Sequence, residues 1–366
     1  MALLTKRFGL TVLASFILIL VMAACGAKTP EPAKTAGAPA ATTQPSGASG
    51  TGGGAKEELP KEVRIGFQVI PNAELLTKAL GLAEKKFPNT TIKWVQFDSG
   101  RDVNTAIASG SIDLGLAGSV PVATGLANKL PYQVYYLHDI IGDNEALAVR
   151  KSSGVQSVKD LKGKKVAVPF GSTTHFSLLS ALKNEGVDPA GVTVLDMQPN
   201  DILAAWQRKD IDGAFVWQPT LAKLVALDGQ IVTTAKKLSE KGIVTADVGI
   251  VRKAFADQYP AFLKQYVTVL DDAVKQYRSK PADAAKALAP ILSTTEADSL
   301  SQMNELVWLL SSEQRDAKYL GAPGKIGDFA KVLKETGDFL VTQKSIPAAP
   351  DLAAFQSGVR PDAVQP

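Results

Sequence analysis

A glycine and four hydrogen-bonding side chains separate an apolar strand from an apolar helix in the sequence VAVPFGSTTHFSLL, residues 166–179. After Gly171 these residues are Ser172, Thr173, Thr174 and His175. The first backbone N–H groups of a helix have no partner within the helix, and the helix dipole adds positive potential there. One Ser or Thr would be enough for an ordinary N-cap. The segment therefore predicts an anion site, with a simple helix cap as the alternative.

A similar turn follows another apolar strand in LAGSVP, residues 116–121. Gly118 allows a neighbouring group to approach the backbone closely, and Ser119 supplies an N–H and a hydroxyl group. Trp217 ends a third apolar strand, GAFVW, where it would be either a pocket wall or part of the core. Ligands of open α/β sheets bind at this end of the strands, so these residues extend the candidate site.

Acidic residues are a second group of candidates. Asp247 stands at the start of the apolar strand VGIVRK, and Glu145 directly precedes ALAV. Each carboxylate would either be solvated at a strand end or face a ligand cation. The chain has two histidines, no Gly-x-Ser-x-Gly motif and no metal-ligand spacing. We therefore expect a binding protein without a cofactor or metal, rather than an enzyme.

Strand and helix patterns alternate from residue 61 and restart in a second half of the chain. EVRIGFQV predicts a strand, and NAELLTKALGLAEKKF predicts a helix with Asn72 as its N-cap. This alternation indicates an α/β fold in which helices cover two mainly parallel sheets. The expected first lobe comprises residues 61–147 and 251–366, and the second comprises residues 148–250.

The chain would cross between the lobes near residues 145–151 and 247–252, in two hinge strands. The segment after residue 252 is expected to be helical and to pack on the first lobe, including TTEADSLSQMNELVWLLSS near its middle. Two lobes that face each other with polar strand ends would enclose a cleft.

The N-terminal 60 residues differ in composition from the rest of the chain. Lys6 and Arg7 precede an apolar stretch that ends in VMAAC, so residues 1–24 predict a signal peptide. This ending resembles a lipoprotein signal, so the only cysteine, Cys25, would carry a lipid anchor; the alternative is a secreted protein with an incidental cysteine. Residues 25–60 are rich in Ala, Gly, Pro, Ser and Thr, which predicts a disordered linker. A net charge of +4 is too small to indicate a nucleic-acid partner.

Three segments together resemble the taurine-binding proteins of bacterial ABC transporters: FDSGRDVNTAIASGSIDLGLAGSVP, GKKVAVPFGSTTHFSLLSALKNEGV and LAAWQRKDIDGAFVWQPTLAKL. The wider family also includes binders of alkanesulfonates, nitrate and thiamine precursors. The resemblance implies a periplasmic-binding-protein type II fold, a ligand held between the lobes, and a permease and ATPase as partners. It also implies an extracytoplasmic, monomeric protein. The lipid anchor and linker expected from the N-terminal sequence are unlike the freely periplasmic members of the family, and they would hold this protein at the outer face of its membrane.

For taurine, the resemblance implies a place for each end of the ligand. The sulfonate would lie on Ser172, Thr173 and Thr174, beside His175, with Gly118 and Ser119 from the other lobe. The ammonium group would pair with Asp247 as first choice or Glu145 as second. Trp217 and Gln68 would wall the pocket. Many relatives are expected to carry an aromatic residue where Gly249 stands, so Gly249 would widen the pocket.

Several alternatives stay open from the sequence. A general alkanesulfonate or nitrate binder would need no carboxylate in its site, because an unpaired buried carboxylate is costly. A pyrimidine-processing enzyme on the same fold is an alternative of a different class, and it would change its ligand on incubation. A ligand sensor that signals to a membrane kinase is a third.

Overall fold

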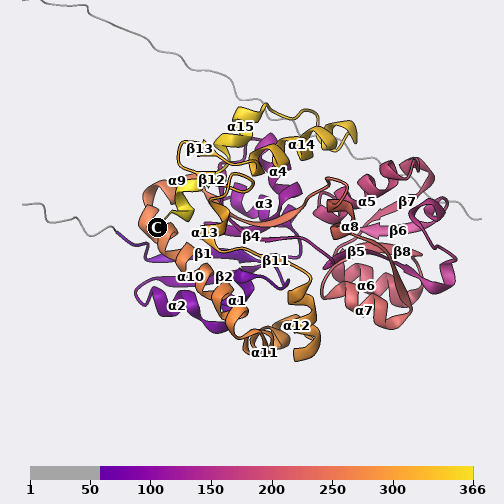
Figure 1. The fold of residues 1–366 in the computed structure, drawn as a ribbon, viewed down its shortest axis with the longest axis horizontal. Coiled ribbons are helices and arrows are strands. Elements are labelled where there is room, and N and C mark those ends of the chain that lie inside the picture. Colours follow the sequence, from indigo (N-terminus) through magenta and orange to yellow (C-terminus); the bar gives the residue numbers. More distant parts are fainter. Residues whose placement is uncertain (1–57, 366) are drawn as a thin grey trace, which may run out of the picture. The chain divides into compact units, whose positions relative to one another are not determined.

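The computed structural model describes residues 58–365 of the 366-residue chain. These residues form two lobes, each built around its own sheet (Figure 1). The two-lobed α/β fold predicted from the sequence is confirmed. The predicted signal peptide, Cys25 and the linker up to residue 57 lie outside the described residues. Within residues 58–365, no helix combines the length and the apolar character needed to cross a bilayer.

The first lobe contains a six-stranded sheet with the strand order β11-β4-β10-β3-β1-β2. Strands β1, β2 and β3 are parallel, whereas β10 runs antiparallel between β3 and β4. The sheet is buried because helices cover both faces, and its strands carry long apolar runs as such sheets require. The strands are β1 (Glu62–Phe67), β2 (Thr91–Gln96), β3 (Leu114–Gly118), β4 (Tyr132–Ile140), β10 (Ala246–Arg252) and β11 (Val307–Trp308).

Helices of this lobe form two groups on opposite sides of the sheet, as Figure 1 shows. One group is α3 (Gly100–Ala108), α4 (Ser119–Ala127), α14 (Phe329–Thr342) and α15 (Leu352–Ser357). The other includes α1 (Ala73–Leu80), α2 (Leu82–Lys86), α10 (Pro260–Ser279), α11 (Pro281–Leu292) and α12 (Glu296–Asn304). The short elements α9 (Lys253–Gln258), α13 (Ser311–Gln314), β12 (Gly321–Ala322) and β13 (Lys325–Ile326) complete the lobe.

The second lobe contains a five-stranded sheet with the order β7-β6-β8-β5-β9. Its two faces bury separate apolar clusters, one under α5 and α8 and the other under α6 and α7. The strands are β5 (Glu145–Arg150), β6 (Lys165–Val168), β7 (Thr193–Asp196), β8 (Gly213–Trp217) and β9 (Gly229–Thr234). The helices are α5 (Thr173–Asn184), α6 (Pro199–Arg208), α7 (Thr220–Leu227) and α8 (Ala235–Ser239).

The strand pairings place the two crossings a few residues before the positions expected from the sequence. All of β5 pairs with β8 and β9 in the second sheet, and all of β10 pairs with β3 and β4 in the first. The chain therefore crosses at residues 141–144 and again at residues 240–245. The hydrophobic pattern could not reveal this, because a strand looks the same in either sheet.

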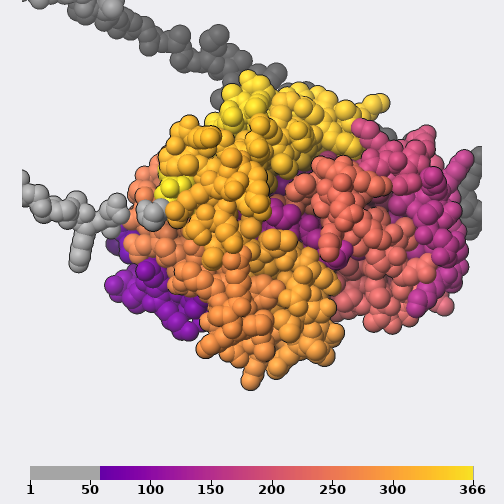
Figure 2. All heavy atoms as spheres, viewed as in Figure 1, coloured from indigo at the N-terminus to yellow at the C-terminus, as the bar shows by residue number. Residues whose placement is uncertain are grey.

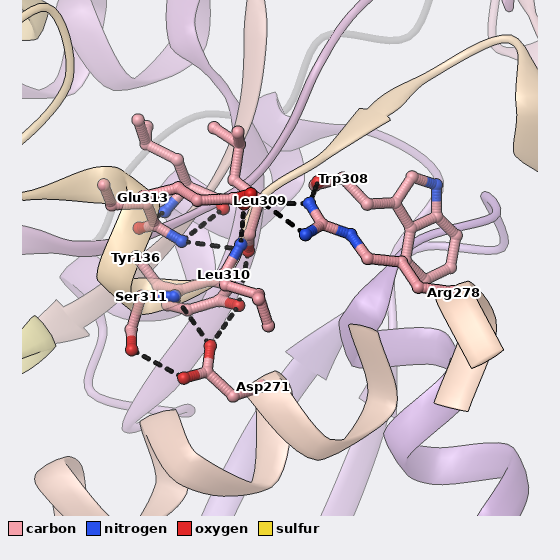
Figure 3. Close-up of polar contacts among 10 residues, drawn as sticks. Tyr136, Asp271, Arg278, Trp308, Leu309, Leu310, Ser311 and Glu313 are labelled. Carbon is pink, nitrogen blue, oxygen red and sulfur yellow. Dashed lines mark hydrogen bonds and ion pairs between the residues drawn. The ribbon is translucent and has the colours of Figure 1, made fainter. Parts of the chain in front are cut away.

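Strand β11 is a second difference from the sequence-based expectation, which placed one helix across this region. Helix α12 ends at Asn304, and Val307 and Trp308 then pair with Ile140 and Asp139 at the end of β4. Two residues of α10 hold the segment after Trp308, as Figure 3 shows. Asp271 accepts hydrogen bonds from Tyr136 and from the backbone and side chain of Ser311, and Arg278 donates to Trp308 O and pairs with Glu313.

Helix α14 links the C-terminal part of the first lobe to the second lobe. The Phe339 ring packs edge-on against Phe176 of α5, with ring centroids 4.8 Å apart. Val120 at the start of α4 joins the same apolar cluster. Figure 2 shows yellow atoms of this C-terminal segment against the magenta atoms of the second lobe. One apolar cluster thus supports the starts of both α4 and α5.

Candidate functional site

A cavity of about 340 Å³, including its opening, lies between the two lobes. Most of the residues around it follow the carboxyl end of a parallel strand or begin a crossing strand, as expected for ligand sites in open α/β sheets. Its lining residues are Gln68, Ile70, Gly100, Gly118, Pro121, Asn144, Glu145, Ser172, Thr173, Trp217 and Asp247. Both lobes contribute, so a ligand here would touch each of them.

Three helices begin at this cavity. Gly100 is the first residue of α3, Gly118 precedes α4, and Thr173 is the first residue of α5. The N-cap residues of α3 and α4 make no side-chain capping bond. Their first N–H groups are therefore available to a ligand, and the three helix dipoles add positive potential to the same space. This arrangement suits an anion without any cationic side chain.

At the start of α5, the three hydroxyl groups have different tasks. Ser172 caps the helix by accepting the N–H of His175, and its hydroxyl also donates to Pro169 O. Thr174 is fully buried and shares a hydrogen bond with the Ser172 hydroxyl. Thr173 donates to the Glu145 carboxylate at 2.5 Å. Of the three residues, Ser172 and Thr173 reach the cavity.

Three predicted site residues have side chains that do not line the cavity. The buried Ser119 hydroxyl accepts the N–H of Ala246 and so supports the start of β10. The Thr174 hydroxyl group is hydrogen-bonded to the Ser172 hydroxyl group. His175 stacks on Phe170 with ring centroids 4.5 Å apart, and its Nδ1 accepts the N–H of Gly171. Burial lowers the pKa of His175 to about 4. These side chains shape the turns, and the sequence could not separate that task from ligand contact.

Gln68 and Trp217 stand on opposite lobes at the wall of the cavity. The Gln68 amide donates to Leu116 O at 3.0 Å, which fixes the direction of its side chain. Trp217 is buried and packs with Ile70 and Leu116 of the first lobe. Pocket wall and core residue were the two alternatives for Trp217 from the sequence. In the structure it is both, since it belongs to an apolar cluster and lines the cavity.

Gly118 allows the two lobes to meet closely. A Cβ atom at this position would lie 2.7 Å from the Thr173 methyl group of the second lobe. Such a distance is far below an ordinary contact, so only glycine fits while the lobes are this close. Asp247 Oδ1 lies 3.7 Å from the same point, which places a carboxylate next to the start of both α4 and α5.

Gly249 does not widen the cavity as expected from the sequence. A Cβ atom there would lie 2.7 Å from the ring of Tyr135. The space beside Gly249 is therefore filled by Tyr135, a fully buried residue of β4. Residue 249 has no side chain to fill this space, and Tyr135 of the neighbouring strand β4 fills it with an aromatic ring instead.

Three buried carboxyl groups gather beside the cavity. Burial raises the pKa of Glu145 to about 8, with a further contribution from the charge of Asp247, while the Thr173 hydrogen bond opposes the shift. Burial also raises the pKa of Asp247 to about 7. The third group is Asp139, whose pKa is held well above its usual range by burial and then by the charges of Asp247 and Glu145. Within residues 58–365, no positive side chain lowers the pKa of any of the three carboxyl groups.

Asp139 was not among the residues singled out from the sequence. The apolar run YQVYYL in the sequence ends two residues before Asp139, whereas strand β4 continues through Asp139 to Ile140. A longer strand would have placed an aspartate inside an apolar run, which is the signal that drew attention to Asp247. In the part of the chain that the structure describes, no group of three or more His, Cys, Asp or Glu residues is arranged to hold a metal ion.

The fold and the cavity define a class: a two-lobed α/β protein that holds a small ligand between its lobes. A family model described as the substrate binding domain of ABC-type glycine betaine transport systems matches residues 61–307. The chain belongs to this family, and the resemblance to solute-binding proteins of ABC transporters is confirmed. It is a binding protein of a transport system and not an enzyme.

Three named proteins are similar to this chain in sequence or in structure. The chain is 38% identical over 259 residues to the taurine-binding periplasmic protein of Escherichia coli K12, which covers 69% of this chain and 80% of the relative. A solved alkanesulfonate-binding protein from Xanthomonas axonopodis pv. citri, bound to MOPS, has a TM-score of 0.69 and 24% identity and covers 82% and 98% of the two chains. The periplasmic nitrate-binding protein of Synechocystis PCC 6803 has a TM-score of 0.65 at 14% identity, covering 83% and 87%. These two structures establish the fold.

The buried carboxyl groups predict a specific dependence of stability on pH. Glu145 and Asp247 have raised pKa values, so the folded protein binds more protons than the unfolded chain at intermediate pH. Their stabilising effect is complete at acid pH and is lost as the pH rises through the raised pKa values. Between about pH 5 and about pH 8, Asp247 alone should lower the free energy of unfolding on the order of 2 kcal/mol.

Urea unfolding of the ligand-free protein at both pH values tests this expectation. Relative to wild type, Asp247→Asn should be more stable at the higher pH than at the lower one, because it removes the group that must ionise. Asp98→Asn, at an exposed position, is the control and should show no such difference. An equal effect of Asp247→Asn at both pH values would contradict the raised pKa.

Proposed function

We propose that this protein captures taurine, or a close aminosulfonate, between its two lobes and delivers it to the permease and ATPase of an ABC importer. The observation that carries this proposal is the pairing of two opposite features in one cavity. Three helix N-termini offer N–H groups to an anion, and buried carboxyl groups without a protein cation offer a partner to an amine. A zwitterion with a sulfonate at one end and an ammonium at the other satisfies both.

The anionic end of the ligand would lie among the starts of α3, α4 and α5. Two of these helices have no side-chain cap, and the Thr173 hydroxyl adjoins the cavity. In this assignment the backbone N–H groups donate most of the hydrogen bonds to the sulfonate, and Ser172 stabilises the turn by capping α5. Ser119, Thr174 and His175 support the geometry from outside the cavity.

The amine end would lie at Asp247, with Glu145 next to it. Both line the cavity, and both are buried enough that an unpaired charge would be unfavourable. A ligand ammonium would supply the missing positive charge and form charge-assisted hydrogen bonds. A plain alkanesulfonate or nitrate would leave these carboxyl groups without a partner, which favours taurine over those alternatives.

The relatives support the same ligand class. One is named a taurine-binding periplasmic protein and another an alkanesulfonate-binding protein, so sulfonates recur among proteins of this fold. The proposed mechanism is capture and closure: the ligand bridges the lobes, and the closed protein docks on the permease. We propose that the chain acts as a monomer outside the cytoplasmic membrane, tethered through a lipid on Cys25.

Replacing Asp247 tests the amine assignment directly. Asp247→Asn keeps the shape of the side chain and removes its charge, so it should weaken taurine binding at least tenfold, about 1.4 kcal/mol or more. Ethanesulfonate has the same anion and no amine, and its affinity should change little. Calorimetric titration of both ligands measures the two effects. Equal losses for both would show that Asp247 does not face the amine.

Adding a methyl group at Gly118 tests whether the lobes must close as tightly as described. Gly118→Ala would place its Cβ against the Thr173 methyl group and hold the lobes apart. We expect taurine affinity to fall by about tenfold or more, since overpacking at a rigid contact costs roughly 1–3 kcal/mol. Gly191→Ala is the matched control, because its Cβ meets only Lys162 at 3.6 Å. Unchanged affinity of the Gly118 variant would mean that ligand capture does not need this contact.

Cys25→Ser tests the proposed lipid anchor. The variant should leave the membrane fraction of expressing cells, because the only cysteine of the chain is the sole thiol that could carry the lipid. Metabolic labelling with a fatty acid should mark the wild-type protein and not the variant. Labelling of the variant at wild-type level would overturn the anchor while leaving the ligand proposal intact.

A further inference from the structure

Among the described residues, Asp139 is a buried acidic residue to which the proposed function assigns no role. It lies on β4 directly opposite Asp247 of β10, and on its other side β4 pairs with Trp308 of β11. Directly opposite residues of antiparallel strands point to the same face, where two like charges are destabilising. Asp139 is fully buried, and neither of its carboxyl oxygens has a hydrogen-bond donor among the described residues.

The other groups around Asp139 do not neutralise it. Glu145 at the start of β5 adds a third carboxyl group, already hydrogen-bonded to Thr173 of α5. His138, the neighbour on β4, has its Nε2 3.8 Å from Glu74 and is kept neutral because burial lowers its pKa to about 3. Glu305 accepts from Gln218, and Asp143 pairs with Lys236.

Two buried carboxyl groups at close quarters are not both ionised when no cation lies beside them, and such pairs commonly hold one proton between them. We propose that Asp139 and Asp247 share a proton in the ligand-free protein, and that capture of an amine-bearing ligand releases this proton to the solvent. Asp139 is then a positioning residue, since it acts on the ligand through Asp247. The identity of the amine ligand rests on the function proposed above.

The exchange balances in protons and charge. The ligand ammonium keeps its own proton and brings one positive charge into the cavity. One carboxyl O–H bond breaks and the proton passes to the buffer, so the ammonium then lies beside two carboxylates. The pair with the ligand cation keeps the single negative charge that the empty pair carried. A sulfonate without an amine brings no positive charge, so the shared proton stays. The shared proton thus spares the empty site a second buried negative charge, and an amine is selected because it can replace that proton.

Calorimetric titration of the full-length protein with taurine near neutral pH tests the release. A released proton is taken up by the buffer, and phosphate and Tris differ in their ionisation enthalpies. The binding enthalpy measured in the two buffers should therefore differ by the amount that about one released proton per bound taurine produces. Ethanesulfonate should give the same heat in both buffers. Asp139→Asn removes the shared proton, so the buffer difference for taurine should be clearly smaller than in wild type; what remains comes from the raised pKa values of Asp247 and Glu145. Asp98 is an exposed residue that does not line the cavity, so Asp98→Asn should show the same buffer difference as wild type.

Infrared spectra of the ligand-free protein provide a second measurement that does not depend on the ligand. The C=O stretching band of protonated carboxyl groups at neutral pH should be weaker in Asp139→Asn than in wild type or Asp98→Asn. If Asp139→Asn fails to fold, the same band can be followed in the wild-type protein instead, where its intensity should fall when taurine binds. Taurine binding without proton release would overturn the inference, as would an unchanged buffer difference in Asp139→Asn. Failure of taurine to bind would instead overturn the proposed function, and the infrared comparison would then decide the shared proton alone.

Discussion

Burial of carboxyl groups without a protein cation is the constraint on which this site depends. Asp139, Glu145 and Asp247 are buried near the cavity, and no positive side chain in the described part of the chain lowers their pKa values. A protein tolerates such groups by keeping them protonated or by binding a cation from outside. Stability and ligand recognition are therefore coupled: the groups that destabilise the empty protein at higher pH are those that an amine ligand would satisfy.

The two crossing strands explain how these acids reach the cavity. Strand β10 enters the first sheet antiparallel to β3, so its first residues meet the carboxyl end of β3 and the start of α4. Strand β5 enters the second sheet in the same way, which pairs Glu145 with Trp217. The acids thus come from strands that begin at the cavity, whereas the helix starts proposed to hold the anion follow strands that end there. Opposite strand directions therefore place the two proposed subsites side by side.

Much of the fold and part of the site could be predicted from the sequence. The alternation of strands and helices was strong enough to give two lobes, and the strand-to-helix turns marked Gly118 and Thr173 at the cavity. The positions of Ser119, Thr174 and His175 could not be predicted, because capping and ligand contact require the same residue types. Asp139 and the short strand β11 depend on pairing between segments far apart in the chain, which no local pattern reports. Tyr135 beside Gly249 is a third case of this kind.

The most direct test of the account is calorimetric titration of the purified protein with taurine, ethanesulfonate and nitrate in parallel. We expect tight binding of taurine and much weaker binding of ethanesulfonate and nitrate, because only taurine has a positive end for the buried carboxyl groups. Binding of ethanesulfonate or nitrate as tight as that of taurine would contradict it. The helix starts would then remain as the anion site, and the carboxyl groups would have no part in choosing the ligand.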